Sequence, residues 1–131
     1  MLTVRSRPCP SCPYRRDVPS GIWHESEYAK LIRYDAETGS QPPEMFHCHQ
    51  RDEQICAGWA GCHDMANNLA VRLALVMDRI GPDVLDYVSP VPLFASGTEA
   101  AVHGMRDVAA PGPDAERKMR QIHRLQARRA R

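Results

Sequence analysis

FHCHQRDEQICAGWAGCHD, residues 46–64, brings together three of the five cysteines and three of the six histidines of the chain. A second, smaller group lies upstream, where Cys9 and Cys12 stand in the stretch RPCPSCPYRR. Cysteine sulfur and histidine nitrogen are the ligands of zinc and iron–sulfur centres, and ligands from separate segments must converge on the metal. We therefore expect the two segments to close on one metal centre around which the chain folds.

The composition indicates one small domain whose core is too small to stabilise it without a metal or disulfides. The chain has 131 residues, of which 6% are aromatic, 11 are proline and 8 are glycine, so few large side chains are available for a core. The first residues, MLTVRSRPCP, contain no apolar signal-peptide region, and no apolar run approaches the ~20 residues of a membrane span. These features predict a cytoplasmic protein without a membrane partner. In a reducing compartment, clustered cysteines bind metal more often than they form disulfides.

The predicted fold is mostly α and irregular, a small metal-stapled domain with a basic C-terminal helix. Apolar periodicity, interrupted by proline and glycine, predicts helices over residues 23–35, 64–80 and 114–131. Residues 1–110 then form the metal-binding domain, and residues 111–131 form a linker and the basic helix. Two further helical turns are expected, one beginning at Pro82 and one capped by Thr98.

Residues 64–80, DMANNLAVRLALVMDRI, give the strongest helical pattern in the chain. Asp64 is a good N-cap, and Gly81 with the proline after it ends the helix. Because this helix would begin directly after Cys62 and His63, its N-terminal amides are expected to point toward the ligand segment. One apolar stripe follows helical spacing and is expected to face the core: Met65, Leu69, Leu73, Val76 and Ile80.

The spacing of the cysteines leaves several ligand sets open. Cys9 and Cys12 have the C-x2-C spacing that delivers two sulfurs from one turn. The second pair is either Cys48 with Cys56 or Cys56 with Cys62, and a histidine can replace a thiolate: His47, His49 or His63. The arginines near the first pair are either solvated or offset the negative charge of a thiolate centre: Arg5, Arg7, Arg15 and Arg16.

The pattern C-x2-C-P-Y-R-R…G-I-W…F-x-C-H…C-A-G-W resembles a family of small uncharacterised proteins of actinobacteria and their phages, known only as a domain of unknown function. The resemblance covers about residues 8–64 and brings no activity with it. A fainter similarity to WhiB-like iron–sulfur regulators lies in C-x2-C-P-x-R and a Gly-x-Trp, although their closely spaced third cysteine is missing. The family's shared positions imply that the ligands are Cys9, Cys12, Cys48 and Cys56, with Cys62, His63 and His49 in reserve.

Two observations favour different metals. A four-cysteine site in a small cytoplasmic domain is most often structural zinc. In contrast, Pro13 follows Cys12, where a zinc knuckle usually has a glycine, and Cys-Pro is found in bacterial ferredoxin loops. We expect zinc, with a [4Fe–4S] cluster as the alternative.

The C-terminal segment indicates how the protein would contact a partner. Residues 114–131 contain seven lysines and arginines against two acids, a charge suited to nucleic acid or an acidic protein. The predicted function is therefore a binding or regulatory module that contacts nucleic acid or the transcription machinery. The expected contact residues are Arg117, Lys118, Arg120, Arg124, Arg128 and Arg129.

Two alternative functions follow from the same residues. One is an iron–sulfur redox sensor, in which the state of the cluster switches a partner interaction. The other is a metalloenzyme with an open position on its metal. The chain contains neither an HExxH nor an H-x-E…P-C-x-x-C pattern. A non-enzymatic role is therefore favoured, and no catalytic residue is assigned.

Overall fold

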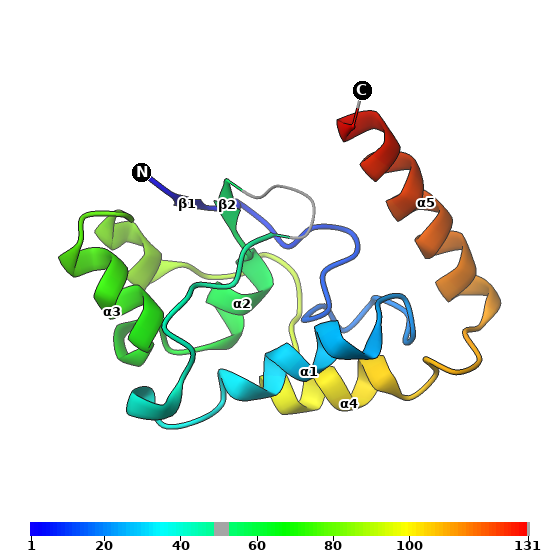
Figure 1. Ribbon diagram of the computed structural model, residues 1–131, viewed down its shortest axis with the longest axis horizontal. Coiled ribbons are helices and arrows are strands. Elements are labelled where there is room, and N and C mark those ends of the chain that lie inside the picture. The colour runs from blue at the N-terminus through cyan, green and yellow to red at the C-terminus, as the bar shows by residue number, and fades with distance from the viewer. Residues whose placement is uncertain (49–52, 131) are drawn as a thin grey trace.

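The computed structural model describes residues 1–48 and 53–130. In this part of the chain helices dominate and the two strands are two residues long each, which confirms the mostly α fold (Figure 1). The elements are β1 (Thr3–Val4), α1 (Glu25–Arg33), η1 (Thr38–Ser40), β2 (Gln54–Ile55), α2 (Ala57–Cys62), η2 (Met65–Asn67), α3 (Leu69–Val76), η3 (Pro82–Asp86), α4 (Gly97–Met105) and α5 (Pro113–Arg129), where η marks a 3-10 helix.

The pairing of β1 with β2 ties the N-terminal segment to the ligand-rich segment. The two strands run parallel, and Val4 pairs with Ile55. Ile55 also forms an antiparallel bridge with His47 and is fully buried. Three stretches of chain therefore meet beside Cys56.

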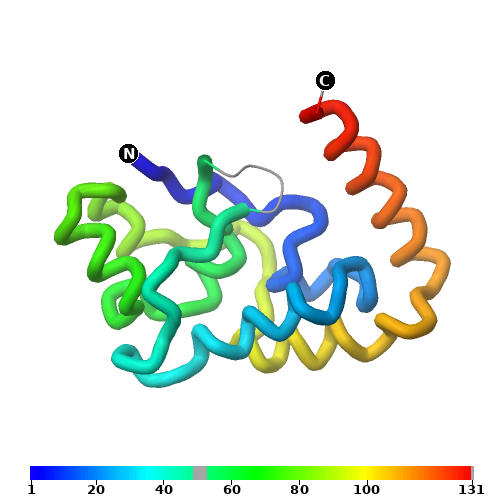
Figure 2. Tube along the Cα trace, viewed as in Figure 1, coloured from blue at the N-terminus to red at the C-terminus, as the bar shows by residue number. Residues whose placement is uncertain are grey.

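Helices α1 and α4 pack closely and lie side by side in both views of the backbone (Figures 1 and 2). Two glycines of α4 allow this approach. A Cβ on Gly104 would overlap the ring of Tyr28, and a Cβ on Gly97 would overlap the backbone carbonyl of Leu31. Tyr28 and Leu31 are almost fully buried as a result.

The start of α4 is capped from two directions. Ser96 Oγ accepts a hydrogen bond from the backbone N–H of Glu99 at 3.0 Å, so the predicted cap, Thr98, is wrong by two residues. Asp35, just after α1, accepts hydrogen bonds from the backbone N–H groups of Gly97 at 2.8 Å and Thr98 at 2.6 Å. The carboxylate therefore joins the end of α1 to the beginning of α4.

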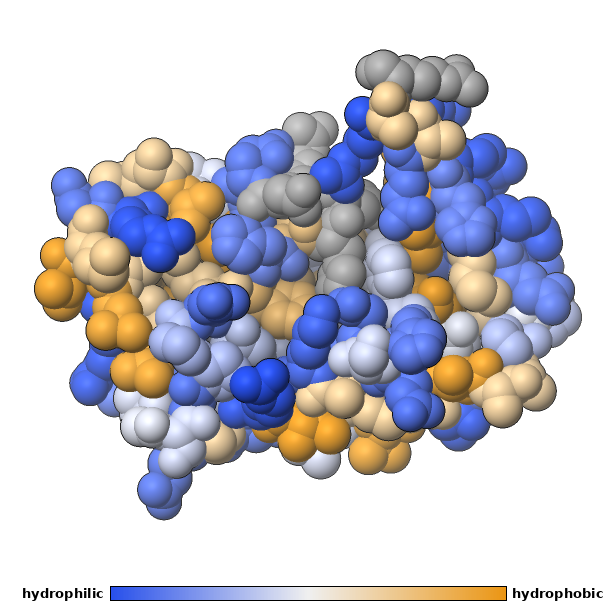
Figure 3. Space-filling view, viewed as in Figure 1, coloured by the Kyte–Doolittle hydropathy of each residue, from blue (hydrophilic) through white to orange (hydrophobic). Residues whose placement is uncertain are grey.

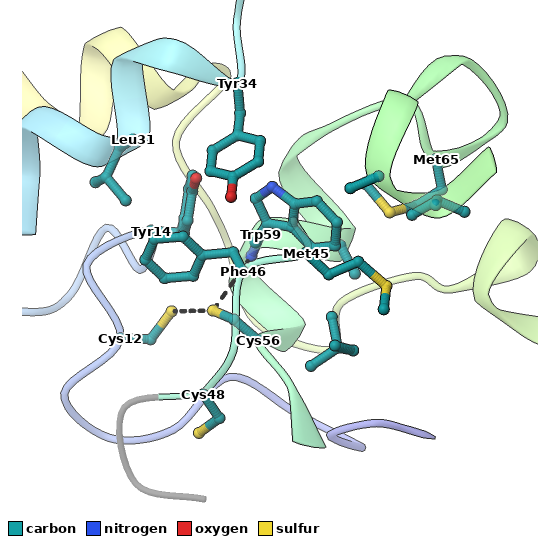
Figure 4. Close-up of a cluster of buried hydrophobic side chains, with 14 of the residues drawn as sticks. Cys12, Tyr14, Leu31, Tyr34, Met45, Phe46, Cys48, Cys56, Trp59 and Met65 are labelled. Atoms are coloured by element: carbon teal, nitrogen blue, oxygen red, sulfur yellow. Dashed lines mark hydrogen bonds between the residues drawn. The ribbon is translucent and has the colours of Figure 1, made fainter. Parts of the chain in front are cut away.

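An aromatic cluster forms the centre of the core (Figure 4). Trp59 on α2 and Tyr14 are fully buried. Tyr34 meets Trp59 edge to face with ring centroids 5.5 Å apart, and Phe46 meets Tyr14 in the same way at 6.0 Å. The cysteines border this cluster on the side of Tyr14, so the ligand segment and the core are one packed unit.

The predicted helix over residues 64–80 is split in the structure. Asp64 caps only the 3-10 turn η2, and Asn68 caps α3 by accepting a hydrogen bond from Val71 N–H at 3.0 Å. Because a 3-10 turn has about three residues per turn rather than 3.6, the helical phase changes at Asn68. The predicted stripe is therefore wrong in α3: Leu73 and Val76 are 42% and 87% exposed, and the apolar surface over α3 is visible in Figure 3. The buried residues of α3 are Ala70, Val71 and Ala74.

The last helix, α5, begins at Pro113, and Gly112 precedes it without a side-chain cap. Asp114 at the start of the predicted helix over residues 114–131 is of a type that favours N-caps, but here it lies inside the helix and forms an ion pair with Arg117. Ala115 and Ile122 are the buried residues of α5, and beyond them the helix projects from the body (Figure 1). The division of the chain into a metal-binding domain and a C-terminal appendage stays a prediction.

Within the described residues, no helix is both long enough and apolar enough to cross a membrane.

Candidate metal centre

The C-x2-C segment forms a series of tight turns. The backbone N–H of Cys12 donates to the carbonyl of Cys9 at 3.0 Å, and Arg15 N–H donates to the carbonyl of Cys12 at 3.1 Å. Both thiols are buried, with Cys9 4% and Cys12 0% exposed. The two proline-flanked cysteines therefore point inward from one turn, as their spacing predicted.

The second pair of cysteines lies on two paired arms of the chain. Cys48 N–H donates to the carbonyl of Gln54 at 2.9 Å, and Cys56 N–H donates to the carbonyl of Phe46 at 2.8 Å. Cys56 then becomes the N-cap of α2, because its Sγ accepts a hydrogen bond from Trp59 N–H at 3.4 Å. This pairing brings together two cysteines that are eight positions apart in the sequence.

The structure places the four predicted ligands in one buried region. Cys12 Sγ lies 3.8 Å from Cys56 Sγ (Figure 4), and interactions with Cys12 and Cys48 lower the pKa of Cys9. All five cysteines of the chain are free, and these four are at most 4% exposed. We call this group the thiol cluster: Cys9, Cys12, Cys48 and Cys56.

The thiol cluster holds negative charge unevenly. Hydrogen bonds from Cys12, and then from Cys48, lower the pKa of Cys9 to about 2. Burial, followed by the hydrogen bonds to Cys56 and Cys9, raises the pKa of Cys12. These opposite shifts favour a thiolate at Cys9 over one at Cys12, and a bound cation would allow both groups to be thiolates.

A cation of the protein reaches one edge of the cluster. Arg5 Nη1 lies 3.6 Å from Cys48 Sγ and donates to it. Two of the other arginines near the C-x2-C turn are engaged elsewhere, since Arg15 pairs with Asp17 and Arg16 with Glu99. Of the four arginines considered in the sequence, Arg5 thus contacts a thiol.

Glycine is required where α2 passes the cluster. A Cβ at Gly58 would overlap Cys12 Sγ and would lie 2.8 Å from Tyr14 Cβ. The glycines on either side of Trp59 predict tight turns close to the cluster, whereas Gly58 lies within α2. The close packing of α2 against Cys12 therefore requires a residue without a Cβ at position 58.

The sulfurs are in contact but do not surround a common centre. Among residues 1–48 and 53–130, no three side chains of His, Cys, Asp or Glu lie in an arrangement that would hold one ion. Cys12 contacts Cys56, and Cys9 interacts with Cys12 and Cys48. Binding one ion through all four therefore requires these side chains to draw together.

The reserve ligands lie at the other end of α2. Six helical residues separate Cys56 from His63, which corresponds to about 9 Å along the axis. Burial, and then the charge of Asp35, raises the pKa of Cys62 to about 12. His63 Nε2 is 3.3 Å from the Tyr14 hydroxyl, and its Nδ1 is 3.8 Å from Asp35, so the imidazole has other partners.

The histidines before Cys48 have different positions. His47 lines a cavity of about 590 Å³ with Cys48 and with Lys30 and Arg33 of α1. This cavity reaches the edge of the thiol cluster from solvent. His49 lies outside the described residues.

The sequence predicted a core position for Trp23 but did not predict the hydrogen bond that its side chain makes. Its Nε1 donates to the carbonyl of Ser11 at 2.9 Å, and Ser11 lies between the two cysteines of the C-x2-C turn. Asn68, the cap of α3, was also missed; its preference for N-cap positions was the available signal.

The predicted partner residues on α5 form an exposed basic helix. Its acids, Asp114 and Glu116, are both in the first turn, and no acid follows them within the helix. The surface over α5 is largely hydrophilic in Figure 3. The cations after Glu116 are Arg117, Lys118, Arg120, Arg124, Arg128 and Arg129.

These features define a small, mostly helical domain built beside a buried group of four cysteines. The chain belongs to DUF6283, a family of unknown function, whose family model matches residues 4–129. The match includes α5, so the basic helix lies within the family region. No curated protein and no solved structure matches the chain. The resemblance to WhiB-like proteins stays a hypothesis.

Proposed function

We propose that this protein is a zinc-stapled binding module, in which the thiol cluster holds one metal ion and α5 contacts the phosphate backbone of nucleic acid. The separation of Cys12 Sγ and Cys56 Sγ, 3.8 Å, supports the metal assignment most directly. Four sulfurs around a tetrahedral zinc, each at ~2.3 Å from the ion, are about 3.8 Å apart. One edge of the cluster therefore already has the spacing of a zinc–thiolate site.

The same distance favours a single ion over an iron–sulfur cluster. In a [4Fe–4S] centre each cysteine binds a different iron, so the ligand sulfurs stand farther apart than around one zinc. Pro13 after Cys12 supports the cluster as the second candidate. An absorption band near ~400 nm from anaerobically purified protein would favour iron, whereas colourless protein with one equivalent of zinc would exclude it.

A metal at this position would close long loops. The C-x2-C turn and Cys48 are separated by more than thirty residues, which contain all of α1. Joining such distant segments in the unfolded chain is entropically costly, so a metal bound only by the folded state stabilises that state. Trp59 N–H and Arg5 would neutralise part of the negative charge of the thiolates.

Elemental analysis of the wild type and three variants tests the ligand set. We expect one equivalent of zinc in the wild type and its loss in Cys9→Ala and Cys56→Ala. Cys62→Ala is the matched control, because it removes a half-buried thiol outside the thiol cluster. Full zinc content in both cluster variants would overturn the assignment.

Charge distribution supports nucleic acid as the partner. On the body, Lys30 pairs with Glu27 and Arg106 with Asp107. On α5, Arg117 pairs with Asp114, and no acid follows Glu116 within the helix. Arg120, Arg124 and Arg128 follow i, i+4, i+8 spacing and are exposed, so they form one stripe. Regularly spaced phosphates complement such a stripe without sequence readout.

Salt dependence of binding to double-stranded DNA tests this second part. We expect affinity to fall with salt, and the slope of log K against log salt to decrease by roughly 3 in an Arg120→Ala, Arg124→Ala, Arg128→Ala triple variant. A body variant with the same charge change provides the control: Arg72→Ala, Arg79→Ala, Arg106→Ala. Equal slopes for the two variants, or tighter binding to polyglutamate than to DNA, would exclude the phosphate contact.

A further inference from the structure

Trp23 fastens the C-x2-C turn to the rest of the chain. Its indole Nε1 donates to the carbonyl of Ser11 at 2.9 Å. Ser11 is itself 1% exposed, and its Oγ lies 3.7 Å from Cys9 Sγ. A change in the path of the C-x2-C turn would therefore move the hydrogen-bond acceptor of Trp23.

The same indole ring contacts the surface on which α5 rests. A small hydrophobic cluster, which we call the α5 platform, consists of Val18, Ile22, Ala115 and Ile122. Ala115 and Ile122 are the buried residues of α5. Among the described residues, Trp23 is the side chain that packs against both the main core and the α5 platform.

The remainder of the platform is held without the metal centre. The hydroxyl of Tyr28 accepts hydrogen bonds from the backbone N–H groups of Ile22 at 3.1 Å and Trp23 at 3.2 Å. Gly21 adopts φ +82°, and a Cβ there would lie 2.6 Å from the carbonyl oxygen of Asp107. Since α1 and the segment after α4 fix this end, a change in the C-x2-C turn would reach the platform at the end that faces Ser11.

We propose that metal binding at the thiol cluster controls the docking of α5, with Trp23 as the link between the C-x2-C turn and the α5 platform; this inference rests on the proposed function. With metal bound, the turn is fixed, Ser11 holds the indole, and α5 is docked with its cations in one orientation. Without metal, the turn loosens, Trp23 loses its hydrogen bond, and α5 is released. A docked helix binds a polyanion with a smaller loss of conformational entropy, so nucleic-acid affinity falls when the metal is removed.

Amide hydrogen exchange across residues 115–122 tests the coupling, with α1 and α4 as internal references. In the wild type we expect removal of zinc by a chelator to accelerate exchange in α5 more than in α1 and α4. Trp23→Phe keeps the thiols and an apolar ring but loses the N–H donor. In the zinc-bound state this variant should exchange roughly fivefold faster in α5, the change expected from one hydrogen bond, with its zinc content unchanged.

Tyr87→Phe is the matched control. Tyr87 also donates one side-chain hydrogen bond to the N-terminal segment, to the carbonyl of Ser6 at 3.1 Å, but it does not pack against the α5 platform. Its α5 exchange should equal that of the wild type. Two outcomes would overturn the coupling alone. In the first, the wild type binds one equivalent of zinc but the exchange rate of α5 does not change when zinc is removed. In the second, α5 exchanges at the same rate in Trp23→Phe and Tyr87→Phe. If the wild type binds no metal, both the proposed function and the metal-controlled docking of α5 are wrong.

Discussion

The α1–α4 pair and the thiol cluster are stabilised by different interactions. In the α1–α4 pair, nine-residue helices pack through Gly97 and Gly104, and Asp35 joins their ends. Around the thiol cluster, the regular elements are two-residue strands and the six-residue α2. Short elements like these supply few cooperative hydrogen bonds. The first region is therefore stabilised by helix packing and capping, whereas the second has little regular backbone structure of its own and depends on side-chain contacts.

Of the experiments that compare the two regions, zinc removal should give the largest difference between their stabilities. We expect a chelator to lower the free energy of unfolding by at least about 4 kcal/mol when free zinc had been a thousandfold above its dissociation constant. Exchange protection should be lost in α2 before it is lost in α1 and α4. Chemical unfolding with and without the chelator, followed by amide exchange, measures both effects. Identical unfolding curves would show that the thiol cluster is stable as a set of buried thiols.

Two glycine substitutions compare the regions with the same chemical change. Gly58→Ala places a methyl group against Cys12 Sγ, and Gly104→Ala places one against the ring of Tyr28. Each should destabilise by about 1–3 kcal/mol through overpacking. Only Gly58→Ala should also lower zinc affinity, which a competition titration with a chromophoric chelator would measure. Gly39→Ala is the control, because no atom lies within 4 Å of the added Cβ.

An equal loss of zinc affinity in Gly58→Ala and Gly104→Ala would mean that the two regions form one cooperative unit. The metal would then stabilise the α1–α4 pair as strongly as the turn that contains Cys12.

The sequence indicated which segments contribute to the thiol cluster better than it indicated how the backbones of these segments pair. The C-x2-C turn is a local structure, so its spacing alone indicated two inward thiols. Cys48 and Cys56 lie in one region because their arms pair through Phe46 and Gln54, and the second arm also pairs with β1, which is distant in the sequence. No periodicity marks a strand of two residues.

The helices show the same limit. The helix predicted over residues 23–35 agrees with α1 because acids, apolar residues and cations follow one helical pattern there. Over residues 64–80, Asp64 and Asn68 are both good caps, and the structure uses both. The helical pattern does not determine which cap begins the longer helix. The contact of Trp23 with Ser11 was not predictable, because it joins segments through a tertiary hydrogen bond.

Asp35 makes the α1–α4 pair sensitive to acid. Burial alone would raise its pKa, but hydrogen bonds from Thr98, and then from Gly97, outweigh burial and lower the pKa below its usual value. His63 faces the same carboxylate at 3.8 Å. Because the folded pKa is depressed, the stabilisation is present above the unfolded pKa of about 3.9 and is lost as pH falls through the folded value.

Asp35→Asn measures this contribution. At pH 7 we expect it to lower the free energy of unfolding by about 1 kcal/mol, the usual cost of weakening a helix cap. At about pH 3, below the unfolded pKa, the difference from the wild type should be smaller, because the unfolded chain takes up a proton that the folded carboxylate binds less readily. Urea unfolding at the two pH values tests this, and any acid release of metal affects both proteins alike. If the stability difference between Asp35→Asn and the wild type stayed constant with pH, the effect would come from the changed shape of the side chain and not from the loss of its charge.

The effect of Arg5 should be confined to the thiol cluster. Its guanidinium donates to Cys48 Sγ at 3.6 Å, a long bond to a weak acceptor, and it lies at the edge of the cluster. We expect Arg5→Gln to lower zinc affinity by roughly tenfold, the lower end of the range for groups that hydrogen-bond a metal ligand. Arg7→Gln removes the same charge from an exposed side chain two positions away and should leave the affinity near that of the wild type. Equal losses in the two variants would show that the general positive charge of this segment stabilises the thiolates, whereas a loss confined to Arg5→Gln identifies the hydrogen bond to Cys48 as the cause.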